Sequence, residues 1–193
     1  MARFSLFSFL CMNGVHFSPA SPDAIEIRPL KPQDLPHLLT VQQQCYPANI
    51  CERAAVLLQK INDAPAYCWL AVDTVVQAPL GYVLSHPWAG ELPPNLDALW
   101  GKLPAEADCF YVHDIAVVPR GRGLHLAERL YHTAKCQAQH HGLHYTALTA
   151  VQGAASYWAR FGYRVVEPRS HALKTKLARY GEQAVFMQAT LKS

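Results

Sequence analysis

The feature that most constrains this chain is a strand-like run that passes through an Arg/Gly turn into a helix-patterned segment. Residues 110–118 are mostly β-branched or aromatic, Pro119 ends the run, and helical spacing begins at Leu124. In such a unit the first N–H groups of the helix have no intrahelical partner, and the helix dipole adds positive charge there. The sequence therefore predicts a site for phosphate.

The residues of the turn indicate which kind of phosphate-containing ligand it suits. Gly121 and Gly123 let the backbone approach an anion closely, and Arg120 and Arg122 add positive charge. The turn has neither the Gly-Lys-Ser/Thr of a P-loop nor the Gly-x-Gly-x-x-Gly of a dinucleotide fold. We therefore expect it to suit a pyrophosphate.

This segment resembles motif A of the GNAT superfamily of acyl-CoA-dependent N-acyltransferases, which reads Arg/Gln-x-x-Gly-x-Gly/Ala. Residues 120–125 occupy its six positions, and His125 stands where the family has Gly or Ala. Residues 154–163 are similar to the family's later Phe-Tyr-x-x-x-Gly-Phe element. The opening and the ending of the chain resemble the family's first strand and helix and its last strand, so the resemblance covers residues 24–192.

The expected fold class is α/β (α+β), with a mixed, mostly antiparallel central sheet of about six to seven strands flanked by helices, as in GNAT proteins. The predicted strands are residues 24–28, 67–72, 80–84, 109–118, 145–150, 163–166 and 184–190. The predicted helices are residues 33–44, 52–61, 95–102, 124–140 and 154–160.

Length and composition favour a single domain with a sizeable core, since the chain has 193 residues of which 51% are apolar. We expect residues 24–193 to form an N-acetyltransferase domain. Residues 1–23 are expected to be an N-terminal extension, disordered or upstream of the true start. The apolar run at residues 4–12 is too short to span a bilayer, although it leaves a secretory signal open as the alternative.

Charge and cysteine usage bear on partners and compartment. The formal charge is +3 without a block of like charges, which does not favour a nucleic-acid surface. The six cysteines show no Cys-x-x-Cys and no paired spacing, which indicates a reduced, cytoplasmic protein without structural zinc. His132, Cys136 and His140 have a spacing that could bind a metal, but they face away from the helix's apolar stripe, so we expect a solvated surface and no metal.

His113 is the candidate general base. Strand alternation places Tyr111, His113 and Ile115 on one face of the strand and Asp114 on the other, where Asp114 is expected to be a structural acceptor. In the GNAT arylalkylamine acetyltransferases a histidine at this place acts as base, and an imidazole suits that role. The alternative is a half-buried histidine bonded to a carbonyl group.

The resemblance also implies the residues that hold acetyl-CoA. The backbone of Ile115, Ala116 and Val117 would bond the pantetheine arm, and a local bulge would expose the groups needed. The pyrophosphate would lie on Arg120, Gly121, Arg122, Gly123, Leu124 and His125. For His125 a phosphate donor, a cap of the first turn and a solvent-facing side chain stay open.

The later motif departs from the family in two places. Trp158 stands where many members carry a tyrosine that protonates the leaving thiolate, and an indole cannot be a general acid. The adjacent Tyr157 is the candidate acid, although helical geometry turns its side chain away from that of Trp158. The family's cofactor-binding asparagine is replaced by Val151, with Gln152 as the nearest polar substitute.

We expect an enzyme that moves the acetyl group of acetyl-CoA to a primary amine by direct attack on the thioester. The alternative is a non-catalytic acyl-CoA-binding or sensing module, which the missing tyrosine and asparagine motivate. The acceptor is a small-molecule or peptide amine; no nucleic acid or membrane partner is expected, and a homodimer stays open. Residues 85–107, with Trp88 and Trp100, are expected to shape the acceptor pocket, and their acidic residues favour a cationic amine.

Overall fold

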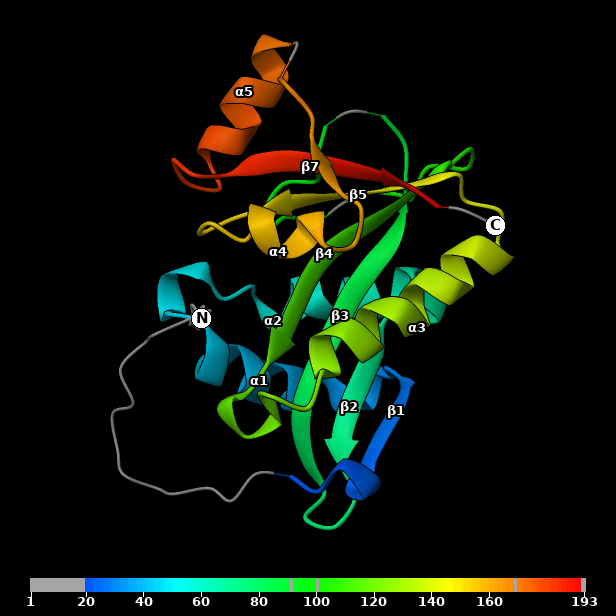
Figure 1. The fold of residues 1–193 in the computed structure, drawn as a ribbon, viewed down its shortest axis with the longest axis vertical. Helices are drawn as coiled ribbons and strands as arrows, with labels where there is room; N and C mark the ends of the chain where they lie inside the picture. Colours follow the sequence, from blue (N-terminus) through cyan, green and yellow to red (C-terminus); the bar gives the residue numbers. More distant parts are fainter. Residues whose placement is uncertain (1–19, 91, 100, 169, 192–193) are drawn as a thin grey trace.

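A seven-stranded mixed sheet crosses the computed structural model, which describes residues 20–90, 92–99, 101–168 and 170–191 (Figure 1). The sheet has the order β1-β2-β3-β4-β5-β7-β6. Its strands are β1 Ile25–Pro29, β2 Trp69–Asp73, β3 Ala78–Trp88, β4 Cys109–Val117, β5 Tyr145–Ala150, β6 Arg164–Val165 and β7 Val185–Thr190. Each neighbouring pair is antiparallel except β4 and β5, which are parallel. The expected fold class is thereby confirmed; the expectations for residues 1–19 lie outside the described residues.

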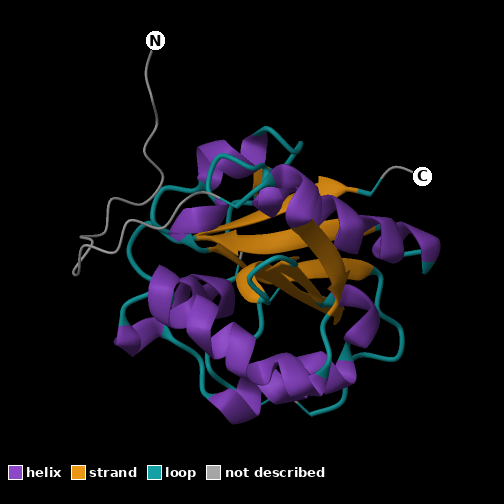
Figure 2. Cartoon of the chain, turned by 90° about the horizontal axis from the view of Figure 1, so that it is seen from below, coloured by secondary structure: helices purple, strands orange, loops and turns teal. Residues whose placement is uncertain are grey.

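Helices cover both faces of the sheet (Figure 2). Helices α1 and α2 pack behind β3 in the view of Figure 1, and α3 crosses the opposite face in front of β2, β3 and β4. The helices are α1 Leu35–Cys45, α2 Ala54–Asp63, α3 Leu126–His140, α4 Ala155–Ala159 and α5 His171–Ala178. The side chains that α3 buries against the sheet recur at helical spacing, at Leu126, Leu130, Ala134 and Ala138.

The strands β4 and β5 separate after their first four residue pairs. Residues 109–112 of β4 pair with residues 145–148 of β5, whereas β4 continues to Val117 beside β3 alone. The second half of β4 therefore has backbone groups on its β5 side that the sheet does not use. This opening lies between the carboxyl ends of two parallel strands, where ligands bind in many mixed sheets.

A bulge in β4 falls at His113. Leu84 of β3 pairs with Asp114 and Ser85 with Val112, which leaves His113 without an opposite residue. Because a bulge interrupts the alternation of side chains, His113 and Asp114 both contact the α1–α2 side of the sheet. The prediction that Asp114 lies on the opposite face from His113 is therefore wrong.

Two helix predictions also differ from the structure at positions where the backbone is left-handed. Helix α3 begins at Leu126 and not at Leu124, because Gly123 and His125 have φ angles of 81° and 54°, in the left-handed region. The described residues within 95–102 contain turns and no helix. Two prolines precede this segment, and Asp97 has a φ of 46°, which no α-helix accommodates.

Gly81 permits the close approach of β3 to β4. A Cβ atom at this position would lie 2.6 Å from the carbonyl oxygen of Ala116. We expect Gly81→Ala to lower the free energy of unfolding by about 1–3 kcal/mol, because backbone must move to relieve the contact. Urea denaturation measures the change. Gly101→Ala is the matched control, since a Cβ there meets nothing within 4 Å; equal stability of the two variants would contradict the prediction.

Candidate active site

The predicted base His113 faces an acidic side chain from a distant part of the sequence. Its Nε2 lies 2.9 Å from Oε2 of Glu52, which belongs to the connection between α1 and α2. The side chains of His113 and Glu52 are only 3% and 4% exposed. The expected alternative, a histidine bonded to a carbonyl group, does not describe this contact, because the partner is a carboxylate.

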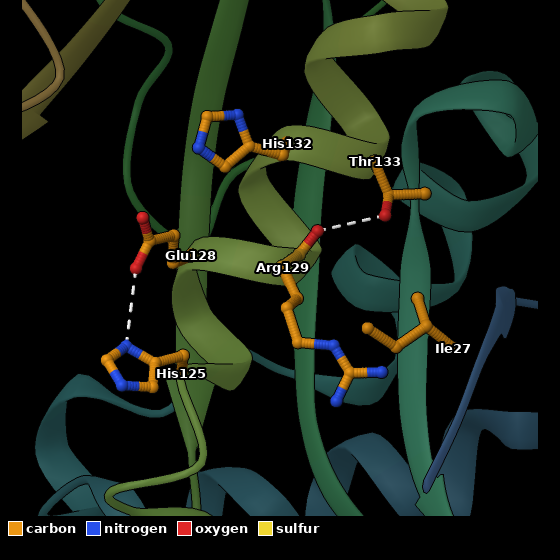
Figure 3. A pocket seen from close by; sticks show the side chains of 6 residues that line it. All are labelled: Ile27, His125, Glu128, Arg129, His132 and Thr133. Carbon is orange, nitrogen blue, oxygen red and sulfur yellow. Dashed lines mark hydrogen bonds and ion pairs between the residues drawn. The ribbon is translucent and has the colours of Figure 1, made fainter.

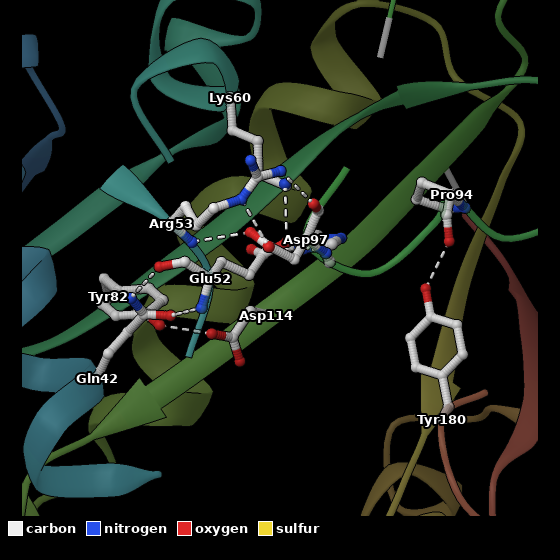
Figure 4. A network of polar contacts seen from close by, with 10 residues as sticks. Gln42, Glu52, Arg53, Lys60, Tyr82, Pro94, Asp97, Asp114 and Tyr180 are labelled. Atoms are coloured by element: carbon white, nitrogen blue, oxygen red, sulfur yellow. Dashed lines mark hydrogen bonds and ion pairs between the residues drawn. The ribbon is translucent and has the colours of Figure 1, made fainter. Parts of the chain in front are cut away.

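Glu52 is fixed through both its backbone and its side chain (Figure 4). The side-chain amide of Gln42 accepts from the Glu52 N–H at 2.9 Å and donates to the Glu52 carbonyl at 3.1 Å. The second carboxylate oxygen, Oε1, accepts from Lys60 Nζ at 3.0 Å and from the backbone N–H of Asp97 at 3.1 Å. Helix α1, helix α2 and the β3–β4 connection thus all hold this one residue.

The neighbours of Glu52 decide its protonation state. Burial alone would raise the pKa of the carboxyl group, but the charges and hydrogen bonds of His113 and Lys60 outweigh burial and lower this pKa to about 2. Glu52 is therefore ionised across the physiological pH range. A buried carboxylate of this kind requires its paired cation, since an unpaired one would be strongly destabilising.

Asp114 forms a separate buried contact next to this cluster. Its two carboxylate oxygens accept from the hydroxyl groups of Tyr46, at 2.6 Å, and Tyr82, at 2.5 Å. Burial raises the pKa of Asp114, although the two tyrosine hydrogen bonds oppose that rise. The expected role of structural acceptor is confirmed, because Asp114 ties α1 to β3 and β4.

The β3–β4 connection is also held by Arg53 and Tyr180. Asp97 accepts from Nε and the backbone N–H of Arg53, at 2.7 and 2.8 Å, and its carbonyl accepts from Nη2 at 2.9 Å. The hydroxyl of Tyr180, between α5 and β7, donates to the carbonyl of Pro94 at 2.5 Å. Residues 92–99 therefore link the α1–α2 connection with the segment before β7. Three leucines of this loop are exposed: Leu92, Leu96 and Leu99.

Of the two tryptophans predicted to shape the acceptor pocket, only Trp88 lies among the described residues. The indole N–H of Trp88, at the end of β3, donates to the carbonyl of Leu92 at 2.8 Å, so it supports the loop. Trp100 lies outside the described residues. The carboxylate of Asp97 is paired with Arg53, which reduces the negative charge that the loop could offer to a cationic amine.

The Arg/Gly turn after β4 is open at its tip. Gly123 is exposed and a Cβ there would meet nothing within 4 Å, whereas Gly121 is buried and a Cβ there would lie 2.9 Å from Cγ1 of Val117. The Arg120 guanidinium donates to Asp73 at 2.9 Å, so this predicted phosphate ligand is engaged with β2. Arg122 is exposed.

His125 precedes α3 in a left-handed conformation, and its side chain is 79% exposed. Its Nδ1 lies 3.4 Å from Oε2 of Glu128 in the first turn of the helix. His125 makes no side-chain cap hydrogen bond, so the expected capping role is not seen. The exposed side chain is compatible with the other two roles, and the phosphate-donor role stays a prediction.

The later motif forms an aromatic cluster against α3. The Trp158 ring lies 5.6 Å from that of Tyr131 and 5.5 Å from that of Tyr163, between ring centres, so Trp158 packs at the edge of the core. Tyr157 is half-buried beneath the Arg160 guanidinium, 4.7 Å from its ring centre. Burial raises the pKa of Tyr157. Gln152 is exposed in the turn after β5, with a φ of 52°.

A shallow depression on α3 is separate from the His113 cluster (Figure 3). It lies on the opposite face of the sheet from α1 and α2, and its lining residues are Ile27, His125, Glu128, Arg129, His132 and Thr133. His132, Cys136 and His140 are exposed on this helix. Within the described ranges, no group of three His, Cys, Asp or Glu residues is arranged to hold a metal ion.

The sheet order, the opening between two parallel strands and the glycine-bearing turn together define an acyl-CoA-binding type of fold. A profile of the Acetyltransferase (GNAT) family matches residues 35–163. The chain belongs to the GNAT acetyltransferase family. Members of this family are usually acetyltransferases. A search of curated proteins finds no match.

Solved structures share the fold at low sequence identity. The GNAT-like decarboxylase GphF in complex with isobutyryl-CoA is 16% identical, with a TM-score of 0.66 over 86% of this chain and 100% of that one. Naa50 of Arabidopsis thaliana, in complex with the bisubstrate analogue CoA-Ac-MVNAL, is 12% identical, with a TM-score of 0.61 over 88% and 99%. The ribosomal-protein-S18-alanine N-acetyltransferase of Escherichia coli is 13% identical, with a TM-score of 0.60 over 88% and 95%.

Among the described helices, none has the length and apolar character needed to cross a bilayer. The described cysteines are free thiols: Cys45, Cys51, Cys68, Cys109 and Cys136.

The buried ring of His86 predicts a pH dependence of stability. His86 is 1% exposed beside His113, and burial lowers its pKa from 6.5 to about 3. As pH falls from 6.5 toward 3, the unfolded chain binds a proton at this ring and the folded chain does not, so the free energy of unfolding decreases. We expect His86→Phe to show a shallower decrease over this range in urea titrations.

The control for this measurement is His171→Phe, at an exposed histidine at the start of α5. Between pH 6.5 and 3, the free energy of unfolding of His171→Phe should decrease as much as that of the wild type. Parallel curves for His86→Phe and the wild type would contradict the prediction.

Proposed function

We propose that this protein is an N-acetyltransferase that transfers the acetyl group of acetyl-CoA to a primary amine by direct attack on the thioester. The observation that carries the proposal is the place of His113. It lies on β4 at the start of the opening from β5, where its imidazole is held by an ionised carboxylate. The GNAT family and the CoA-bound neighbours support acetyl-CoA as the co-substrate.

The fit of the chain to acetyl-CoA is supported by two features. The backbone of Ile115, Ala116 and Val117 has no paired strand on its β5 side, so it can bond the pantetheine arm as an added strand would. The open tip at Gly123, with Arg122, Leu124 and His125 around it, leaves backbone N–H groups accessible to a pyrophosphate. Arg120 and Gly121 hold this turn against the sheet. The Arg120 side chain donates to Asp73, and Gly121 packs closely against Val117. Gln152 and Trp158 complete the proposed cofactor contacts.

The proposed reaction needs a base because a primary amine is mostly protonated at neutral pH. His113 takes one proton from the amine, whose electron pair then forms the C–N bond at the thioester carbon. As the tetrahedral intermediate collapses, the C–S bond breaks and the nitrogen gives up its second proton, which replaces the proton that the departing thiolate takes up to become the free thiol of CoA; the proton on His113 then passes to solvent. Tyr157 is the candidate donor of the proton to the thiolate; a thiolate with an ordinary pKa also leaves without one.

The proposed acceptor is a small-molecule or peptide amine. Naa50 in complex with CoA-Ac-MVNAL and the ribosomal-protein-S18-alanine N-acetyltransferase act on peptide or protein amines by their names, which supports this class. Residues 92–99 and Tyr180 lie against the cluster that contains His113, so they are the proposed acceptor side. We place the reaction in the cytoplasm, where acetyl-CoA is available.

Binding of CoA tests the turn. Gly123 has a φ of 81° and Gly142, at the end of α3, a φ of 73°, and a Cβ at either meets nothing within 4 Å. Both Gly→Ala variants therefore carry similar backbone strain, but only Gly123 lies at the proposed pyrophosphate site. By calorimetry we expect Gly123→Ala to weaken the binding of acetyl-CoA about tenfold, or roughly 1.4 kcal/mol, and Gly142→Ala to bind as the wild type does. Equal affinities would contradict the assigned site, and no heat of binding to the wild type would overturn the proposed function.

Turnover tests the base. A free-thiol assay with acetyl-CoA and a panel of small amines and peptides should show release of CoA by the wild type. We expect His113→Ala to lower turnover by about 10²-fold or more, since general-base catalysis contributes that much. Retained acetyl-CoA affinity would show that the variant is folded. Unchanged turnover would remove His113 from the mechanism, and binding without turnover by the wild type would favour the sensing module.

A further inference from the structure

Glu52 makes more contacts than it would need if its only role were to pair with the charge of Lys60. One oxygen of its carboxylate accepts from Lys60 and from the Asp97 N–H, and the other is turned to Nε2 of His113. Its backbone is clamped by the Gln42 amide. The residue is 6% exposed and lies 61 positions from His113 in the sequence. Such a set of contacts fixes the direction in which the carboxylate points.

We propose that Glu52 is a positioning residue for His113, whose carboxylate holds the imidazole as the tautomer with hydrogen on Nε2 and leaves Nδ1 to take the proton of the acceptor amine. This inference rests on the proposed function for its catalytic consequence. The tautomer itself is a property of the folded protein that does not depend on turnover.

The chemistry of the pair sets the direction of the hydrogen bond. An ionised carboxylate only accepts, so the hydrogen between the two groups belongs to Nε2. A neutral imidazole with hydrogen on Nε2 has its lone pair on Nδ1. Because the pKa of Glu52 is about 2, its carboxylate is too weak a base to keep a proton taken from an amine. Glu52 therefore acts through His113 and stabilises the imidazolium that forms.

The charges around the pair are consistent with this role. Lys60, from α2, neutralises Glu52 while the imidazole is neutral, so the buried cluster gains a charge only when His113 takes a proton. His86, from β3, has its pKa lowered by burial to about 3 and stays neutral. Tyr180, before β7, has its pKa raised by burial and by the charge of Glu52, and also stays neutral. The carboxylate of Asp114 is bonded to two tyrosines.

The loop of residues 92–99 contributes to the same orientation. The Asp97 N–H and Lys60 Nζ both donate to Oε1 of Glu52. The Asp97 side chain also accepts from Arg53, the residue that follows Glu52. Displacement of this loop would remove one of the two donors that keep Oε1 away from His113. The acceptor-side loop and the proposed base are therefore connected through a single carboxylate.

The tautomer of His113 is measured by NMR of the wild-type protein labelled with ¹⁵N-histidine. His113→Asn identifies the His113 signals by their loss. At a pH high enough for the ring to be neutral, we expect hydrogen on Nε2 and an unprotonated Nδ1, and in Glu52→Gln a mixture of the two tautomers. Hydrogen on Nδ1 in the wild type would overturn the proposal, and this result needs no folded variant of Glu52.

Kinetics test the consequence for turnover. We expect Glu52→Gln to lower kcat by about 10- to 100-fold, with the KM for acetyl-CoA unchanged within about twofold. The acid limb of its pH–rate profile should move to lower pH, since the negative charge that favours the imidazolium is gone. Glu52→Asp should restore part of the activity, and the matched control Glu167→Gln, at an exposed site, should behave as the wild type.

The outcomes separate the two proposals. Wild-type kcat and an unmoved acid limb in folded Glu52→Gln would overturn the positioning role while leaving the proposed function intact. Absence of acetyl transfer by the wild type would overturn the proposed function, and the NMR measurement would still decide whether Glu52 fixes the tautomer of His113.

Discussion

The bulge in β4 is the constraint on which the candidate site depends. It leaves His113 without an opposite residue on β3 and turns His113 and Asp114 to the same side of the sheet. Without this extra residue, regular alternation would direct one of the two side chains toward α3. The bulge therefore brings a potential base and a structural carboxylate onto the face where α1 and α2 supply their partners. It also lies where β4 begins to separate from β5.

Much of the fold could be predicted because its signals are local. The apolar spacing of α3, the β-branched run of β4 and the glycines of the following turn each lie within a short window of sequence. Boundaries failed where backbone conformation overrode the pattern, as at Gly123 and His125 before α3 and in the proline-rich loop around Asp97. Helix α5 was not predicted, since it buries only Leu173 and Leu177 and has little amphipathic pattern to detect.

The candidate site could be predicted only in part. His113 and the turn carry motif signals, but Glu52 and Lys60 do not, because their meaning depends on a contact across 61 residues. The sequence pattern of α2 even suggests an ordinary helix start at Glu52. A buried Lys60 on an otherwise apolar helix face was the one available sign, since lysine is rarely buried unless it is paired. Alternation misplaced Asp114 because a single inserted residue cannot be seen in the strand pattern.

The side chain of Asp73 joins two parts of the chain that have different tasks. One of its oxygens accepts from the N–H groups of Val75 and Val76 in the β2–β3 hairpin, and the other accepts from Arg120 in the turn after β4. The tip of the hairpin, where both valines are exposed, is thus linked to the glycine turn through the side chain of Asp73. Sequence changes in a surface hairpin of this kind are usually neutral, but here insertions or deletions would shift the turn before α3, which is the proposed pyrophosphate site.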